Sequence, residues 1–350
     1  MHSSCENTTL INEDSTPVSS TLMFSMGVVG NVMALAILGF HRKEQRTKAS
    51  AFCVLVTGLA MTDLLGTCFV SPIVFVSYAR NASVLGLVGN AHLCNFFAFS
   101  MAFFGLASML ILFAMAVERC LAISHPYFYS QHNTHRVAKR SLPAIYVFCL
   151  LLCSLPFLGF GEHKQYCPGT WCFIRMKSPH PGTTAFSLIY ATLMAFLILA
   201  IFLCNGSVIV SLCQMYQSQK IRRGSVNSAQ RRRKSWFDKG EDEVEHLILL
   251  ALMTTIFVIC SLPLTIRGFI NAIDPDNSER GDLSAFRFNA SNPIVDPWIF
   301  IIFRKTVFRH IRSLLCCQLP CRPTSKGQTP KGPIKQDTCR VPFRPPDSSC

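Results

Sequence analysis

Residues 283–303 read LSAFRFNASNPIVDPWIFIIF, a run that is apolar enough to cross a bilayer although it carries Arg287, Asn292 and Asp296. A charge at membrane depth costs about 2.5–3.5 kcal/mol, so such residues usually face a bundle interior and serve a function. Along a helix, Asp296 lies roughly 13 Å beyond Arg287. We interpret Arg287 as the residue that binds an anionic ligand. We expect the region around Asn292 and Asp296 to help convert ligand binding into a structural change on the cytoplasmic side.

Six further apolar stretches precede this run. Together the seven cover about residues 20–40, 49–78, 92–123, 142–161, 184–214, 246–272 and 283–303. Each supplies the roughly 20 apolar residues that a spanning helix needs. Of the 350 residues, 50% are hydrophobic and only 15% are charged, and the mean hydropathy is +0.34. These values exclude a soluble globule. The expected fold is an all-α membrane protein with seven transmembrane helices.

The basic residues are concentrated on one side of the expected bundle. Most of the 33 Lys and Arg lie in the loops after the first, third and fifth stretches and beyond the seventh. The positive-inside rule therefore places the N-terminus outside and the C-terminus in the cytoplasm. The net charge of +14 then reflects topology and contact with the anionic lipid bilayer, and we expect no nucleic-acid partner.

Four segments follow from this topology: an extracellular head over 1–19, the bundle over 20–303, a membrane-surface helix over 304–317 and a cytoplasmic tail over 318–350. Apolar and basic residues alternate with a helical spacing in 304–317, which is typical of an interfacial amphipathic helix. Its last residues, Cys316 and Cys317, are candidates for palmitoylation. The tail is rich in Pro, Lys, Thr and Ser and is expected to be disordered.

The outer segments contain four cysteines, in a compartment where disulfides persist. They are Cys5, Cys94, Cys167 and Cys172. Four cysteines allow three pairings. One of these pairings, Cys94 with Cys172 and Cys5 with Cys167, would hold the head and the loop 165–173 across the mouth of the bundle. Simple stabilisation of the fold is the alternative role for such bonds.

Two glycosylation sequons lie in outer segments. Asn7 begins one in the head, and Asn81 begins another in the first outer loop. Matches at Asn205 and Asn289 fall within apolar stretches, where the modifying enzyme has no access. We therefore expect glycans at Asn7 and Asn81 alone.

Two further charged sites interrupt the apolar stretches. Asp63 lies within the second stretch and needs a polar partner. The candidates are Asn31, Asn292 and Asp296. Glu118 and Arg119 end the third stretch, and as adjacent residues they should not face each other. Alone, such a pair is typical of interfacial side chains that reach for water, but its place at the cytoplasmic end favours a functional role.

These motifs resemble those of the rhodopsin-like G-protein-coupled receptors, over about residues 20–317. ERC at 118–120 stands where most of that superfamily has DRY. DPWIF at 296–300 replaces NPxxY, and CSLP at 260–263 lacks the Trp of CWxP. Together with GTWCF at 169–173 and Arg287, these variants resemble the prostanoid branch of the superfamily.

Within that branch, the runs 103–117 and 260–267 are most similar to the members that bind prostacyclin. The members that bind prostaglandin D come second, since they closely resemble this chain in the motif at 169–173. The resemblance implies that Arg287 pairs with the carboxylate of a prostanoid lipid, because charge-assisted pairing is strong. It implies that Tyr78 and Thr170 donate hydrogen bonds. It also implies that Phe97 and Phe286 flank the apolar body of the ligand.

The resemblance also implies a signalling route from this ligand. Asp63, Ser108 and Asp296 resemble the interior sodium site of the superfamily. Glu118, Arg119, Asp296 and Pro297 would serve activation and coupling. The implied partner is the heterotrimeric stimulatory G protein at the plasma membrane, which raises cyclic AMP. Members that bind prostacyclin resemble one another in a C-terminal prenylation box with a cysteine four residues from the end. The last four residues here read DSSC, with the cysteine at position 350, so we expect no farnesyl anchor at this end.

Two other classes of protein share some of these features. An organic-anion transporter would also carry membrane charges, but seven spans do not divide into two repeats, and paired Gly-interrupted helices are not evident. An intramembrane enzyme would need His, Cys or Asp residues at a spacing that assembles a metal site or a nucleophile within one helix. No such spacing occurs, so we expect no catalysis, no metal and no cofactor.

Overall fold

The structure of the chain is a computed structural model. It describes residues 5–11, 16–44, 51–124, 127, 129, 134–223, 230–273 and 279–302. The expected surface helix over 304–317, its cysteines Cys316 and Cys317, and the tail over 318–350 lie outside the described residues. The division into four segments therefore stays a prediction.

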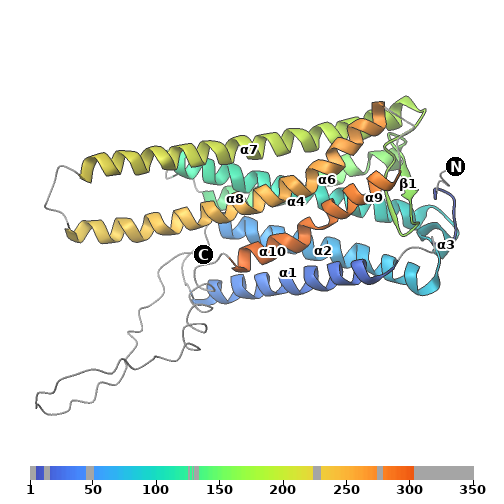
Figure 1. The fold of residues 1–350 in the computed structure, drawn as a ribbon, viewed down its shortest axis with the longest axis horizontal. Coiled ribbons are helices and arrows are strands. Elements are labelled where there is room, and N and C mark those ends of the chain that lie inside the picture. Colours follow the sequence, from blue (N-terminus) through green and yellow to red (C-terminus); the bar gives the residue numbers. More distant parts are fainter. Residues whose placement is uncertain are drawn as a thin grey trace, which may run out of the picture.

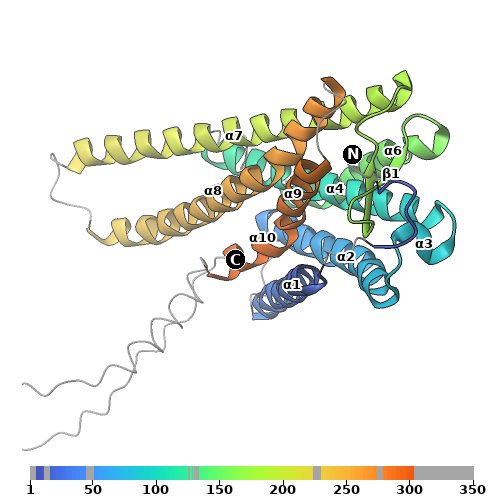
Figure 2. The same ribbon diagram turned by 45° about the vertical axis from the view of Figure 1, so that its right-hand side comes forward.

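Long helices run side by side in an elongated bundle (Figure 1). Six of them, within the described part of the chain, are long and apolar enough to cross a membrane. They are α1 (Val18–Glu44), α2 (Ala51–Arg80), α4 (His92–Ser124), α6 (Thr134–Cys153), α7 (Pro181–Arg223) and α8 (Gln230–Ile273). Figure 2 shows the same bundle turned by 45°, with α9 and α10 lying between α8 and α1. The expected all-α membrane fold is confirmed.

The seventh stretch is not one helix. It forms α9 (Glu279–Ala290) and α10 (Asn292–Ile302), with a break at Ser291. Pro293 in the first turn of α10 has no N–H to donate, and its ring crowds the carbonyl of the preceding turn. Ser291 Oγ instead donates to the Arg287 carbonyl (2.9 Å), and Asn31 Nδ2 donates to the Pro293 carbonyl (2.8 Å). Such a break is tolerated at membrane depth where it lies inside the protein.

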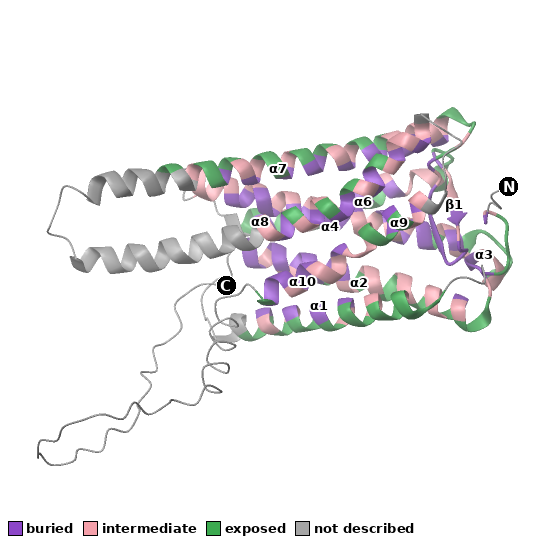
Figure 3. Ribbon diagram, viewed as in Figure 1, coloured by how far each residue is buried: buried purple, intermediate pink, exposed green. Residues whose placement is uncertain are grey.

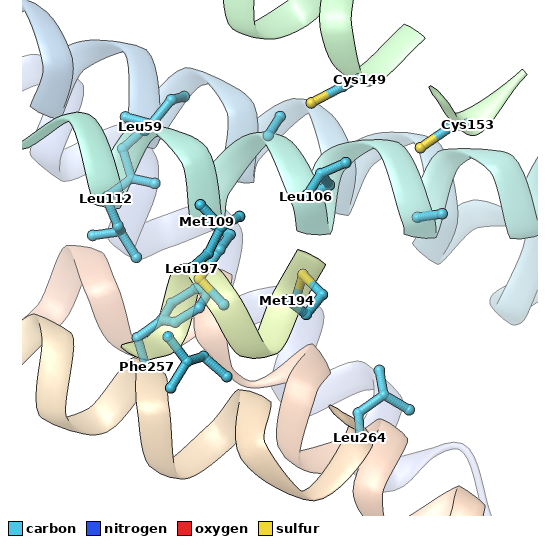
Figure 4. Packing of buried hydrophobic residues seen from close by; sticks show 14 of the residues in the cluster. Leu59, Leu106, Met109, Leu112, Cys149, Cys153, Met194, Leu197, Phe257 and Leu264 are labelled. Atoms are coloured by element: carbon cyan, nitrogen blue, oxygen red, sulfur yellow. The ribbon is translucent and has the colours of Figure 1, made fainter. Parts of the chain in front are cut away.

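Helix α4 occupies the centre of the core. Its side chains Leu106, Met109 and Leu112 are all fully buried. Figure 4 shows Met109 packed close to Leu197 of α7 and Phe257 of α8. Buried residues line the interior of the bundle in Figure 3, and exposed ones follow the outer faces of α1 and α7. Since these exposed residues are largely apolar, the bundle presents the surface expected of a protein in contact with lipid.

The outer end of the bundle is covered by the segment that follows η1 (Leu155–Leu158). Strands β1 (His163–Tyr166) and β2 (Trp171–Ile174) pair antiparallel, with Tyr166 opposite Trp171. Gly169, in the turn between them, has a φ of 101°, which glycine adopts without strain. The sequence predicted a covering loop here but not a β-hairpin.

Two disulfides fix the hairpin: Cys94–Cys172 joins it to the start of α4, and Cys5–Cys167 joins it to the N-terminal head. Gln165 makes further links, because its amide donates to the carbonyls of Cys5 (2.9 Å) and Thr8 (3.0 Å). The head and the hairpin therefore form one covering layer.

Helix α3 (Val84–Val88) completes this layer. Ser83 is its N-cap, accepting from the Gly86 amide (3.1 Å) and donating to the Thr8 carbonyl (2.6 Å). The approach to Gly86 is so close that a Cβ there would lie 2.1 Å from the Thr9 carbonyl oxygen. Asn7 and Asn81 are both exposed, although Ser83 of the second sequon is fully buried. Glycans at the two asparagines stay predictions.

The head is also held by charge. Glu6 pairs with Arg175 and lies 3.6 Å from Lys164 Nζ. Burial acts to raise the pKa of Glu6, but the hydrogen bonds and charges of Arg175 and Lys164 together lower it below the usual 4.5. The contribution of Glu6 to docking of the head is therefore fully present above pH 4.5 and is lost as the pH falls through the lower folded-state pKa.

The lowered pKa of Glu6 leads to a prediction about pH. Amide hydrogen exchange of residues 5–11 should accelerate as the pH is lowered below about 4.5, after correction for the intrinsic rate. Glu6→Gln should show the faster exchange already at neutral pH and little further change on acidification. An identical pH profile in wild type and variant would contradict the role assigned to this carboxylate.

Candidate functional site

A cavity opens beneath the hairpin and runs down between α1, α2, α4, α9 and α10. It holds about 1270 Å³ of atom-free space, part of it open to solvent. All five residues that the resemblance implied for ligand binding line this one cavity. They are Tyr78 of α2, Phe97 of α4, Thr170 of the hairpin turn, and Phe286 and Arg287 of α9.

The roof of the cavity is an aromatic stack. Trp171 lies between Tyr166 (ring centroids 4.7 Å apart) and Phe286 (3.9 Å), with all three rings nearly parallel. The indole N–H donates to the Cys167 carbonyl (2.9 Å), which satisfies the one polar group of this buried side chain. The stack joins the hairpin to α9 and holds Phe286, the residue before Arg287, in place.

Arg287 lies in the last turn of α9 and is exposed. No carboxylate forms an ion pair with it in the part of the chain that the structure describes. The nearby acidic residue of α9, Asp282, is already engaged, since it accepts from Arg267 Nε (2.7 Å) and Asn271 Nδ2 (2.9 Å) of α8. The guanidinium of Arg287 is therefore available to an anion that enters the cavity.

The floor of the cavity carries buried oxygen atoms. Asp63 accepts from the Ser108 hydroxyl (2.7 Å). Among the described residues, Asn31, Asn292 and Asp296 form no hydrogen bond with Asp63, whose hydrogen-bond partner is Ser108. Asn31 turns to the Pro293 carbonyl, and Asn292 Nδ2 donates to Ser261 Oγ (2.8 Å).

Five oxygens at this depth are buried without a hydrogen-bond partner in the described part of the chain. They are Asn31 Oδ1, Asp63 Oδ2, Asn292 Oδ1 and both carboxylate oxygens of Asp296. Every one of them is an acceptor. A group of oxygen ligands with two carboxylates suits a hard cation, so the donor set fits the sodium site that the resemblance implied.

Glu118 and Arg119 form a closed cluster at the opposite end of α4. Arg119 donates through Nε (2.5 Å) and Nη2 (2.7 Å) to the two oxygens of Glu118, and Tyr129 donates a third bond (2.6 Å). The guanidinium also lies over the ring of Phe52, 4.9 Å from its centroid. Both charged residues are less than a tenth exposed.

Our expectation that these adjacent residues would not face each other was wrong. The Cα–Cβ bonds of neighbours do diverge, but the long arginine side chain folds along the helix until its flat guanidinium meets the carboxylate edge on. The interfacial alternative is also wrong, because neither side chain reaches water. Asp296 and Pro297 lie deeper, where a Cβ on Gly30 would be 3.0 Å from the Pro297 ring, so α1 and α10 are in tight contact.

Sequence reasoning missed two contacts of the charged residues. Tyr129, which donates to Glu118, was not singled out, because a tyrosine between two apolar stretches offers no signal of its own. The Arg267–Asp282 pair could have been found, since both charges lie near the same end of neighbouring spans and a buried charge requires a partner. This pair fixes α9, and therefore Arg287, against α8.

The Arg267–Asp282 ion pair can be tested by measuring the free energy of unfolding of variants. Asp282→Ala should lower the free energy of unfolding by about 3 kcal/mol, because it removes the carboxylate that pairs with the guanidinium of Arg267, a side chain only 13% exposed. The double variant Arg267→Met, Asp282→Leu should recover much of the loss. Thermal unfolding of the purified protein in detergent measures both, and equal losses in the single and double variants would refute a buried ion pair.

Comparison with known proteins agrees with this geometry. Residues 30–300 match the family described as 7 transmembrane receptor (rhodopsin family). The chain is 63% identical to the prostacyclin receptor of Rattus norvegicus over 318 residues, which is 91% of this chain and 74% of the relative. It is 59% identical to the prostacyclin receptor of Homo sapiens over 332 residues, 94% of this chain and 83% of the relative.

More distant relatives extend the comparison. The prostaglandin E2 receptor of the EP2 subtype from Canis lupus familiaris is 46% identical over 338 residues, 93% of this chain and 92% of the relative. Among solved structures, squid rhodopsin superposes with a TM-score of 0.71 at 16% identity, over 90% of this chain and 93% of that one. At that identity the likeness shows the fold alone.

Proposed function

The chain belongs to the rhodopsin family of seven-transmembrane receptors, and we propose that within it this protein is a plasma-membrane receptor for prostacyclin. The observation that carries the proposal is the single cavity in which Arg287, Tyr78 and Thr170 come together beneath the hairpin. The high identity to prostacyclin receptors supports the choice of ligand. Enzyme activity is not part of the function, since the relatives are receptors.

The cavity suits a lipid that carries one carboxylate. Arg287 would hold the carboxylate, with the hydroxyls of Tyr78 and Thr170 as additional donors. The rings of Phe97 and Phe286 would contact the hydrocarbon body of the ligand, where burial of apolar surface contributes about 25 cal/mol per Å². Because Phe286 is stacked on Trp171, a ligand that displaces Phe286 would also move the hairpin and the neighbouring Arg287.

The proposed pairing of Arg287 with the ligand carboxylate leads to a prediction about binding affinity. Arg287→Gln should weaken binding of a radiolabelled prostacyclin analogue by roughly 10- to 100-fold, the value of a charge-assisted hydrogen bond. Tyr78→Phe, which removes a neutral donor, should have a smaller effect. The matched control is Arg80→Gln, an exposed residue outside the cavity, which should bind normally. Unchanged affinity in Arg287→Gln at normal surface levels would remove the anchor assignment.

The deeper residues would transmit binding to the other end of the bundle. We propose that a sodium ion held by Asp63, Ser108 and Asp296 stabilises the ligand-free arrangement. On activation the Glu118–Arg119 cluster would open, and Arg119 would contact the stimulatory G protein. The buried acceptor oxygens support the first step, and the closed bidentate pair supports the second.

The sodium proposal has a direct test. Sodium should lower agonist affinity of the wild type by about fivefold or more, the lower range of allosteric coupling. Asp63→Asn removes a charge from the site, so the effect of sodium should fall below about twofold. N-methylglucamine at the same ionic strength is the control for screening. A wild type that is insensitive to sodium would exclude the site.

The choice of ligand and of G protein is tested by cyclic AMP in cells that express the chain. A prostacyclin analogue should raise cyclic AMP at lower concentration than prostaglandin E2 or prostaglandin D. Prostaglandin E2 is the second candidate, because receptors for it are 44–46% identical to the chain. A response led by prostaglandin E2 would overturn the prostacyclin assignment, and accumulation of labelled ligand without a response would favour a transporter.

A further inference from the structure

The two outer glycosylation sequons lie against each other in the layer that covers the bundle. One covers residues 7–9 of the head, and the other covers residues 81–83, directly after α2. The Ser83 hydroxyl donates to the Thr8 carbonyl (2.6 Å), and the Ser83 amide donates to the Thr9 carbonyl (2.9 Å). Docking of the head therefore joins one sequon to the other. We call these two hydrogen bonds the sequon contact.

The sequon of Asn81 is closed although its asparagine is exposed. The Asn81 side chain lies at the surface, and the backbone amide of this residue donates to the Tyr78 carbonyl (3.3 Å). Ser83, by contrast, is fully buried, and its hydroxyl oxygen also accepts from the Gly86 amide (3.1 Å). A glycan on Asn81 is thus compatible with a docked head, whereas the hydroxyl of the same sequon is inaccessible in the folded protein.

Transfer of a glycan to Asn81 needs that hydroxyl. The acceptor pattern demands Ser or Thr at its third position, so the transferring enzyme must contact this group. In the reaction the asparagine amide nitrogen attacks the first sugar carbon of a dolichyl diphosphate oligosaccharide. The bond from that carbon to the diphosphate oxygen breaks, the amide loses one proton, and dolichyl diphosphate leaves. With Ser83 enclosed by the head and α3, the folded chain is not an acceptor at Asn81.

Several interactions keep the sequon contact closed. The Cys5–Cys167 disulfide joins the head to the hairpin across a sequence separation of 162 residues. The buried amide of Gln165 donates to the Cys5 carbonyl (2.9 Å), and Glu6 pairs with Arg175. A segment that is held by a cross-link and by buried hydrogen bonds opens rarely. A sequon that is unmodified when the head docks therefore stays unmodified.

We propose that docking of the head and glycosylation of Asn81 are competing events during biosynthesis. A chain that is modified first carries its glycan on an exposed side chain and still docks its head. A chain whose Cys5–Cys167 bond closes first keeps Asn81 unmodified. The head thus fixes how much of the protein carries a glycan at this site. The inference depends on the head lying outside the membrane and not on the identity of the ligand.

The first test adds the transferring enzyme to protein that has already folded. Full-length protein with Asn7→Gln, which leaves one outer sequon, is made in cells whose oligosaccharyltransferase is inhibited and is purified in detergent. A single-subunit oligosaccharyltransferase and a dolichyl diphosphate oligosaccharide are then supplied. The folded protein should be modified at Asn81 at least about tenfold more slowly than the same chain after reduction and denaturation. The denatured chain also shows that the enzyme is active.

Gly86→Ala opens the sequon contact without changing a cysteine or a sequon. A Cβ at this position would collide with the Thr9 carbonyl oxygen, which belongs to the backbone and cannot turn away. The variant should therefore be modified at Asn81 about tenfold faster than the folded parent. The matched control is Val88→Ala, in the same helix and 55% exposed, which should behave as the parent.

A second open-head variant leaves α3 unchanged. Cys5→Ser, Cys167→Ser removes the bond that joins the head to the hairpin, and it should also be modified at Asn81 faster than the folded parent. Detection of the Cys94–Cys172 bond by mass spectrometry of unreduced peptides shows that the hairpin of each variant is in place.

Partial inhibition of the transferase in cells tests the competition itself. Slower transfer should lower the occupancy of Asn81 more in the parent, whose sequon closes, than in the double cysteine variant, whose sequon stays open. Occupancy is measured by mass spectrometry after enzymatic deglycosylation in isotopically heavy water. Modification of the folded parent at the rate of the denatured chain, no gain in either open-head variant, or an equal fall of occupancy in cells would overturn the proposal. None of these readouts requires ligand binding or activation of a G protein.

Discussion

A bilayer interior offers no hydrogen-bond partner to the backbone, and the whole architecture follows from that constraint. Every stretch that crosses must satisfy its amides within itself, so each becomes a helix. The interruption at Ser291 lies beside an internal cavity, where a serine hydroxyl and the amide of Asn31 supply hydrogen bonds to the carbonyls around it. The same constraint directs Asp63, Asn292 and Asp296 inward, which is why the interior of an apolar protein contains a group of oxygens.

The outer end of the bundle follows a different rule, because water surrounds it and helices are no longer required. There a hairpin, a short helix and the head form one layer, held by two disulfides and by the buried amide of Gln165. The layer turns an open bundle into a roofed cavity. Its stacked tryptophan also fixes the helix that carries Arg287, so the stability of the roof and the geometry of the anchor have the same origin.

The two ends of the bundle differ in how they handle charge. Near the roof, Asp282 neutralises Arg267 and leaves Arg287 available. At the other end, Glu118 and Arg119 neutralise each other inside the protein. Within the described part of the chain, one end therefore leaves the guanidinium of Arg287 without an ion pair, and the other end keeps the guanidinium of Arg119 paired with Glu118.

The amino-acid sequence by itself determined the apolar stretches, the outer cysteines and the charged residues that had to face inward, and it predicts the orientation of the spans. These properties depend on hydrophobicity and charge summed along the chain. It did not determine which polar groups meet. The contact of Asp63 with Ser108, the closure of Arg119 on Glu118, the Arg267–Asp282 pair and the hairpin all depend on how each helix is rotated and how close its neighbours lie. Those quantities are set by the packing of small and large side chains between helices distant in the sequence, and only the tertiary structure decides them.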